Sequence, residues 1–581
     1  MLINEDTFDK PSGEDFLNPT LIAQIASRIY NELPGVSEIP KNENEAVISP
    51  SELENPGDLI QNNSSFDAVL PIDLTNVRNI LSLDGGNIDY NILIPEGETK
   101  KAKESNFGWK SPLPDFEDYY FLHDKNTTSV VPLSEHTDNL VNQQTLPENT
   151  ESAPSLHKFV QKVQSVSGSF SEKTNVNRIF DINQIRKDFP VLNQYVHGKP
   201  LIWFDNAATT QKPQIVIDTI AHFYSHNNSN IHRGAHTLAA RATDGYEGSR
   251  ECVRRFLGAG SSSEIIFVRG TTEAINLVSQ TWGRKNILPG DEILVSVLEH
   301  HANIVPWQML AKEKGAILKP IPVNDRGEIL LDEYSRMLNP RTKLVAVTQA
   351  SNSIGTILPV KEMIRLAKQY DIKVLVDGAQ SVAHLPVNVQ DLDADFFVFS
   401  GHKIFAPTGI GVLYGKKEIL ENMPPWQGGG NMIKDVTFEE TIYNTIPNKF
   451  EAGTPSVGDA IGLGAALDYV NKIGINNIRQ YEQKLTVYAA GQLSQIPGVR
   501  LIGTPREKVG VFSLIINNIN NEQAGRYLDQ EGIAVRAGHH CAQPALRRFG
   551  AETTVRPSLA FYNTFEEVDR LIKAIKKMQY Q

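Results

Sequence analysis

The chain has 581 residues, a formal net charge of −12, 40% hydrophobic residues and two cysteines. This length exceeds one ordinary domain, and two cysteines exclude a disulfide framework, so we expect several domains in a reducing compartment. The acidic balance argues against nucleic-acid binding, and no apolar run is long enough to span a bilayer. The first residues, Met-Leu-Ile-Asn-Glu-Asp, lack the apolar segment of a signal peptide, so we expect a soluble, cytoplasmic protein.

Residues 1–176 form an acidic tail that is rich in Asn, Ser, Glu, Asp and Pro. Up to residue 175 there are 28 Asp and Glu against 12 Lys and Arg, a balance of −16, so the remainder carries +4. Such a segment buries too little apolar surface to offset its chain entropy. The tail is therefore predicted to be largely disordered.

Two apolar clusters interrupt this tail. In residues 18–34, apolar side chains recur on one helical face between an Asn-Pro start and a Pro-Gly end. Residues 107–122 are dense in aromatic side chains, which often anchor small interfaces. Both clusters are predicted to bind a partner protein, and docking of the helix on the remainder of the same chain is the alternative.

From residue 177 onward, apolar segments with strand and helix periods alternate. This alternation predicts an α/β fold with a mostly parallel sheet. Several of the predicted strands end in polar residues, which is where open α/β sheets bind their ligands.

One such strand end carries Thr271 and Thr272, between an apolar strand and the start of a helix. Backbone N–H groups and hydroxyls at a helix N-terminus suit a phosphate, although ordinary N-capping by threonine explains the same residues.

Two further strand ends carry candidate site residues. Residues 293–297 lead to His300, which suits stacking on a flat cofactor or proton transfer, and the segment lacks the histidine spacing of a helical zinc site. Residues 374–376 lead to Asp377, a carboxylate that needs a cationic partner, such as a protonated pyridine nitrogen.

Lys403 lies in a Ser-Gly-His-Lys turn between the apolar strands 396–399 and 410–414. An isolated lysine at a strand end usually extends its amine to solvent, because burying an ammonium is costly. A Schiff-base lysine instead requires a desolvated, easily deprotonated amine.

Four motifs resemble those of the class V, fold-type I pyridoxal-phosphate enzymes: Thr271-Thr272, Glu299-His300-His301-Ala302-Asn303, Asp377-Gly378-Ala379-Gln380 and Ser400-Gly401-His402-Lys403. The segment Arg536-Ala537-Gly538-His539-His540-Cys541-Ala542-Gln543-Pro544 resembles the group II (SufS-type) cysteine desulfurases. The resemblance covers about residues 178–581. It implies a fold-type I transferase, with a cofactor-binding large domain over 177–455 and a smaller α+β C-terminal domain over 456–581.

The resemblance also implies a role for each matching residue. Lys403 would bind pyridoxal phosphate covalently and move the substrate Cα proton, and His300 would stack on the ring and act at the sulfur step. The other cofactor-binding residues would be Thr271, Thr272, Asp377, Gln380, Ser400, His402 and, from the second subunit of a homodimer, Thr454. The substrate carboxylate would be held by Asn352, Arg556 and Arg536.

Cys541 is the candidate nucleophile, because its polar and partly cationic sequence setting favours the reactive thiolate. Cys252 lies in a helix-like stretch and is predicted to be structural. The implied reaction converts L-cysteine to L-alanine, with sulfur taken up by Cys541 as a persulfide for a sulfur-acceptor protein, in sulfur storage or iron–sulfur cluster supply.

Ordinary members of the family lack the long tail. It resembles the cargo-loading domain of desulfurases that are packaged in encapsulin shells, with residues 18–34 and 107–122 as the shell-binding elements. The alternatives are a selenocysteine lyase, another class V lyase or aminotransferase, and a non-catalytic scaffold whose tail is the functional part. A scaffold has no reason to keep Lys403, Asp377, His300, Arg556 and Cys541 together.

Overall fold

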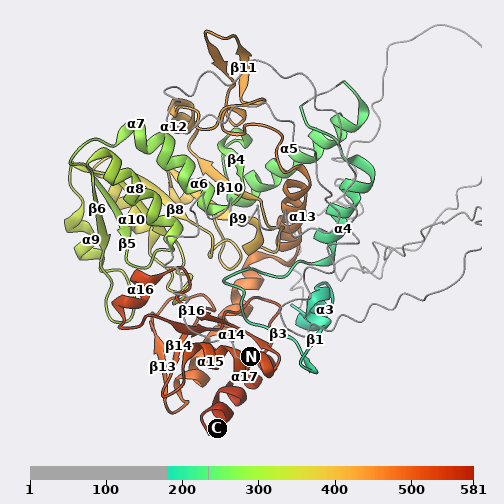
Figure 1. Cartoon of the computed structure of the whole chain (residues 1–581), viewed down its shortest axis with the longest axis vertical. Coiled ribbons are helices and arrows are strands. Elements are labelled where there is room, and N and C mark those ends of the chain that lie inside the picture. The colour runs from blue at the N-terminus through green and yellow to red at the C-terminus, as the bar shows by residue number, and fades with distance from the viewer. Residues whose placement is uncertain (1–179, 233–234, 581) are drawn as a thin grey trace, which may run out of the picture. The chain divides into compact units, whose positions relative to one another are not determined.

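The computed structural model describes residues 180–232 and 235–580 (Figure 1). The predictions for the tail, including those for residues 18–34 and 107–122, lie outside this range. Within it, no helix is long and apolar enough to cross a membrane.

A seven-stranded sheet forms the centre of this region. Only β10 runs antiparallel to its neighbours, β4 and β9, while the other strand pairs of the sheet are parallel. The prediction of a mostly parallel sheet is therefore confirmed. In spatial order the strands are β4 (Ile265–Val268), β10 (Gly411–Gly415), β9 (Phe396–Ser400), β8 (Lys373–Asp377), β7 (Thr342–Thr348), β5 (Glu292–Ser296) and β6 (Ile317–Ile321).

Helices cover both faces of this sheet, so its central strands are apolar along their whole length. In β9, Phe397 and Phe399 belong to one core, and Phe396 and Val398 belong to the other. The first core includes residues of α4 (Gln214–His222), α5 (Thr237–Leu257), α9 (Leu331–Met337), α10 (Val360–Lys368) and α13 (Val457–Ile473). The second includes residues of α6 (Thr271–Val278), α8 (Val305–Lys314) and α12 (Lys417–Asn422).

A separate antiparallel sheet with its own core lies in the C-terminal part of the chain (Figure 1). Its strands, in spatial order, are β13 (Val499–Ile502), β14 (Ser513–Ile516), β17 (Thr554–Arg556) and β16 (Arg536–Gly538). The core contains residues of α14 (Ile475–Ser494), α15 (Asn521–Gln530) and α17 (Phe565–Met578). The domain boundary between residues 455 and 456 stays a prediction.

One short strand pair connects the two ends of the described region, because β3 (Ile202–Trp203) runs parallel to β15 (Ile533–Ala534). The remaining helices and strands are α3 (Ile182–Lys187), β1 (Tyr195–Val196), β2 (Lys199–Pro200), α7 (Arg284–Asn286), α11 (Val389–Leu392), β11 (Ile433–Val436), β12 (Thr441–Tyr443) and α16 (Gln543–Arg548).

A buried ion pair fixes α5 to the segment that precedes Thr454. The Arg250 side chain is 1% exposed, and its two terminal nitrogens donate to the two carboxylate oxygens of Glu451 at 2.6 and 2.9 Å. Tyr246 Oη donates to the same carboxylate at 3.0 Å, and the backbone N–H of Phe267 in β4 donates to it at 2.7 Å. Every oxygen of this buried carboxylate is therefore hydrogen-bonded.

Replacing Arg250 with methionine should lower the free energy of unfolding by about 3–5 kcal/mol, because it leaves Glu451 charged and buried without its partner. Urea denaturation followed by circular dichroism measures the change. The matched control is Arg254→Met, also in α5, whose ion pair with Glu251 is 29% and 39% exposed and should contribute about 1 kcal/mol or less. Equal destabilisation by the two variants would contradict the larger stabilising role given to the buried Arg250–Glu451 ion pair.

Candidate active site

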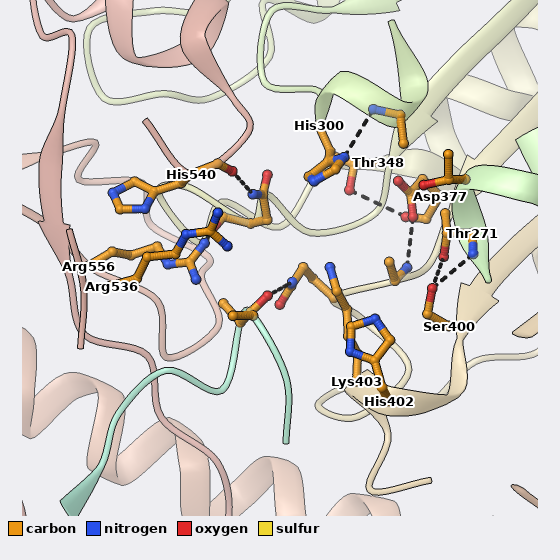
Figure 2. Close-up of a pocket in the computed structure, with 17 residues that line it drawn as sticks. Thr271, His300, Thr348, Asp377, Ser400, His402, Lys403, Arg536, His540 and Arg556 are labelled. Carbon is orange, nitrogen blue, oxygen red and sulfur yellow. Dashed lines mark hydrogen bonds between the residues drawn. The ribbon is translucent and has the colours of Figure 1, made fainter. Parts of the chain in front are cut away.

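All predicted site residues except Cys541 and Thr454 line one cavity of about 230 Å³. Figure 2 shows Arg536 and Arg556 on one side of this cavity and Thr271 and Ser400 on the other, with Lys403 and His300 between them. The polar ends of the central strands supply most of these side chains, as the sequence predicted.

Lys403 ends the tight turn Gly401–Lys403, which follows β9 directly. Within the described part of the chain its amine has no hydrogen-bond partner. Burial lowers the pKa of Lys403 to about 8, although the nearby Asp377 carboxylate acts in the opposite direction. The side chain lines the cavity and is therefore the easily deprotonated amine that a Schiff-base lysine requires.

β10 and the residue that precedes α6 are in close backbone contact. A Cβ atom on Gly411 would lie 2.5 Å from the Cα atom of Gly270, so position 411 has no room for a side chain. This contact brings the start of α6 beside β9, where Ser400 Oγ accepts from the Thr271 N–H and lies 2.9 Å from Thr271 Oγ1.

The N-terminus of α6 is available to an anion. Its N-cap is Gly270, which has no side chain to cap the helix, and Thr271 is the first residue inside it. The N-capping alternative for Thr271 is therefore wrong, and the hydroxyls of Thr271, Thr272 and Ser400 all line the cavity. His402 lies beside them, and burial lowers its pKa to about 4, so the ring is neutral at pH 7.

Asp377 ends β8 and is buried. Its Oδ1 accepts from the Ala379 N–H at 2.8 Å, and burial raises its pKa, against the effects of that hydrogen bond and of the Lys403 charge. A cation at this position would favour the charged carboxylate and be stabilised by it.

Glu299, for which the sequence predicted no role, is a second buried carboxyl near Asp377. It accepts hydrogen bonds from Ser296, from Asn303 Nδ2 at 2.7 Å and from the Thr348 N–H at 3.0 Å. Burial raises the pKa of Glu299 to about 8, to which the charge of Asp377 adds.

Two buried polar atoms on the arginine side lack partners. Arg556 donates from Nη1 to the Asn352 carbonyl at 3.0 Å and from Nη2 to Asp205 Oδ1 at 2.9 Å, but its Nε has no partner in the described residues. Asn352 Nδ2 donates to the His540 carbonyl at 2.7 Å, whereas Asn352 Oδ1 is unpaired there. Asp205 is a further residue whose role the sequence did not reveal. Burial lowers the pKa of Arg556 to about 10, against the effect of the Asp205 carboxylate.

Two more predicted residues line the cavity with fixed orientations. His300 Nδ1 accepts from the Ala302 N–H at 3.0 Å, and burial, followed by the charge of Lys403, lowers its pKa to about 3. Gln380 Nε2 donates to the Ala207 carbonyl at 2.7 Å. The His300 ring is therefore neutral at pH 7.

Cys541 does not line the cavity, although its neighbour His540 and the nearby Arg536 do. Its thiol is partly exposed and lies 3.7 Å from Arg536 Nη2, so the predicted cationic setting is present. Cys252 is buried in α5, and burial raises its pKa to about 11, in agreement with a structural role.

Thr454 is exposed and lies outside the cavity of its own chain. Its hydroxyl accepts from Asn230 Nδ2 at 3.3 Å. Its assignment to the cavity of a second subunit stays a prediction.

The family model described as aminotransferase class V matches residues 202–571. The chain belongs to the class V aminotransferase family. Among its relatives, a cysteine desulfurase of Synechococcus elongatus is 62% identical over 400 residues, which are 69% of this chain and 64% of the relative. A probable cysteine desulfurase of Mycobacterium leprae is 60% identical over 69% of this chain and 66% of its own. The chain thus spans less than two thirds of the length of these two relatives.

A cysteine desulfurase of Escherichia coli K12 is 50% identical over 401 residues, which are 69% of this chain and 98% of the relative. The crystal structure of the E. coli cysteine desulfurase CsdA matches with a TM-score of 0.65 and 39% identity, over 69% of this chain and 99% of that one. A cysteine desulfurase from Thermococcus onnurineus matches with a TM-score of 0.65 and 38% identity, over 68% and 97%. The predicted fold-type I architecture is confirmed.

Pyridoxal phosphate is the cofactor of the class V family, and the cavity of this chain fits it. The hydroxyls of Thr271, Thr272 and Ser400 at the start of α6 suit its phosphate, and buried Asp377 suits a protonated pyridine nitrogen. Lys403 presents an unpaired amine between these two ends. The unpaired Arg556 and Asn352 atoms remain for an acidic substrate group on the other side.

Proposed function

We propose that the chain is a pyridoxal-phosphate-dependent cysteine desulfurase of the group II type, which converts L-cysteine to L-alanine and takes the sulfur onto Cys541. The observation that carries this proposal is a partly exposed thiol beside Arg536, at the edge of a complete class V cavity. The E. coli K12 relative, named a cysteine desulfurase and matched over 98% of its length, supports it.

Bound pyridoxal phosphate supplies an electron sink for the α-carbon of the substrate. The Lys403 amine takes the proton from that carbon and later returns it, a task that suits its lowered pKa. Arg556, Arg536 and Asn352 hold the substrate carboxylate. The Asp205 carboxylate orients the Arg556 guanidinium through its hydrogen bond to Nη2.

The sulfur step is a thiolate attack. The Cys541 thiolate attacks the substrate sulfur, an S–S bond forms, and the bond between that sulfur and the substrate β-carbon breaks with its electron pair on carbon. Neutral His300, whose Nδ1 accepts from the Ala302 N–H, gives its Nε2 proton to that carbon, and the proton of the substrate thiol replaces it on the ring. Cysteine and one enzyme thiol thus give alanine and one enzyme persulfide, and a sulfur-acceptor protein then removes the outer sulfur.

The test uses the full-length chain with pyridoxal phosphate, L-cysteine and a reducing thiol, and measures alanine and sulfide. Equal amounts of both products are expected. Alanine from L-selenocysteine but not from L-cysteine would instead identify a selenocysteine lyase. Transfer of the amino group to a keto acid without sulfide release would identify an aminotransferase and overturn the proposal.

We also propose that the enzyme is a homodimer and that the acidic tail loads it into an encapsulin shell. About a third of this chain lies outside the matches to its relatives, and residues 18–34 and 107–122 supply two motifs suited to a partner groove. Co-expression with an encapsulin shell protein, followed by shell purification, tests the loading. Deleting residues 1–176 should abolish co-purification while desulfurase activity persists. Retention of that truncated enzyme in the shell would contradict the proposal.

A further inference from the structure

The turn that carries Cys541 has an unusual backbone. His540 and Cys541 both have a φ of 54°, which is uncommon for residues other than glycine and rarer still at two consecutive positions. Such conformations persist only where the surrounding structure holds them in place. The contacts that hold this turn are therefore informative about the reactivity of the thiol.

His301 and His539 both make hydrogen bonds with this turn. The Cys541 carbonyl accepts from the His301 N–H at 2.8 Å, and the Cys541 N–H donates to His539 Nδ1 at 3.1 Å. The Gln543 N–H donates to His301 Nε2 at 3.3 Å. The His301 and His539 rings stack on each other, with centroids 5.9 Å apart and an interplanar angle of 29°. These contacts of His301 and His539, with residues 541–543 and with each other, are called the clasp below.

The clasp requires both imidazole rings to be neutral. Each ring accepts a backbone N–H with one nitrogen, and a protonated imidazole has no acceptor nitrogen. Two protonated rings in a stack would also repel each other. Burial, followed by the charge of His539, lowers the pKa of His301.

Other titratable and charged groups lie near the pair. The His300 ring lies 6.2 Å from that of His301 and is neutral, and Arg536 lies beside Cys541.

We propose that His301 and His539 are positioning residues, which hold the Cys541 turn in its reactive conformation while both rings are neutral and release it when either ring gains a proton. The effect of the two histidines on the reaction rests on the proposed function, because it requires Cys541 to be the nucleophile. The clasp itself does not depend on that function.

The first measurement is hydrogen exchange by mass spectrometry on the full-length holoenzyme, for a peptide that spans residues 538–545. After correction for the intrinsic exchange rate, protection should fall as the pH is lowered from 8 to 5. His539→Ala and His301→Ala should each lower protection at pH 8 by roughly fivefold, the loss of one hydrogen bond. His539→Asn and His301→Gln place a carbonyl oxygen where the accepting nitrogen was, and they should keep protection at both pH values.

The second measurement is the pH profile of kcat for alanine formation. The parent enzyme should show an acid limb that is shifted or flattened in the Asn and Gln variants, whereas the alanine variants should lose kcat at every pH. His197→Ala, which removes an exposed ring paired with Asp529, is the control and should change neither measurement. Unchanged protection in both alanine variants would overturn the proposal. If the exchange pattern is as predicted but the enzyme forms no alanine from cysteine, the proposal for the clasp is supported and the proposed function is refuted.

Discussion

Replacing Cys541 with serine should abolish alanine formation from L-cysteine, with a loss of about a thousandfold or more. A serine hydroxyl stays protonated at neutral pH and cannot attack the substrate sulfur as a thiolate does. Because Cys541 does not line the cavity, the bound cofactor should keep its visible absorbance in the variant. Steady-state alanine formation and the absorbance spectrum measure the two effects separately.

Cys252→Ser is the matched control for this prediction, since the chain has two cysteines and Cys252 is buried in α5. Its persulfide yield should match that of the parent enzyme. Persulfide detected on Cys252 in the Cys541→Ser variant, or unchanged alanine formation, would refute the assignment of the nucleophile.

Replacing Lys403 with alanine should remove the covalent attachment of pyridoxal phosphate and stop alanine formation. The Lys403 amine is the unpaired base in the cavity, and an alanine supplies neither the bond to the cofactor nor the acceptor for the α-carbon proton. After borohydride reduction, intact mass spectrometry should find the cofactor mass on the parent enzyme and not on the variant.

Lys403→Arg tests whether a positive charge at this position is enough for activity, because a guanidinium keeps the charge but stays protonated at neutral pH. It should be as inactive as Lys403→Ala. The exposed Lys361, which pairs with Asp391, provides the control Lys361→Ala, with unchanged activity. Cofactor mass that survives reduction on Lys403→Ala would show that another amine forms the bond.

The sequence predicted the sheet and most of the cavity because both depend on local patterns. Apolar runs that end in Asp377, His300 or the Lys403 turn identify strand ends, and parallel strands bring those ends to one edge of a sheet. The structure confirms that these side chains line one cavity.

The parts that the sequence did not reveal depend on contacts between distant segments. Asp205 and Arg556 are 351 positions apart, and nothing near either residue indicates the other. Glu299 lies next to His300 in sequence, yet its burial near Asp377 follows from the packing of β5, β7 and β8. The left-handed turn at Cys541 contains no glycine at its two unusual positions, so no local signal predicts it.

Because Asp205 and Arg556 are 351 positions apart, the ribosome adds them to the chain at different times. The strands and helices of the central sheet leave the ribosome before β17, and domains form as their segments become available. At typical translation rates, 351 residues take on the order of 20 to 70 s. The nascent chain can therefore present the cofactor-binding end of its cavity while Arg536 and Arg556 at the other end are still missing, so the whole cavity forms only after β17 has been synthesised.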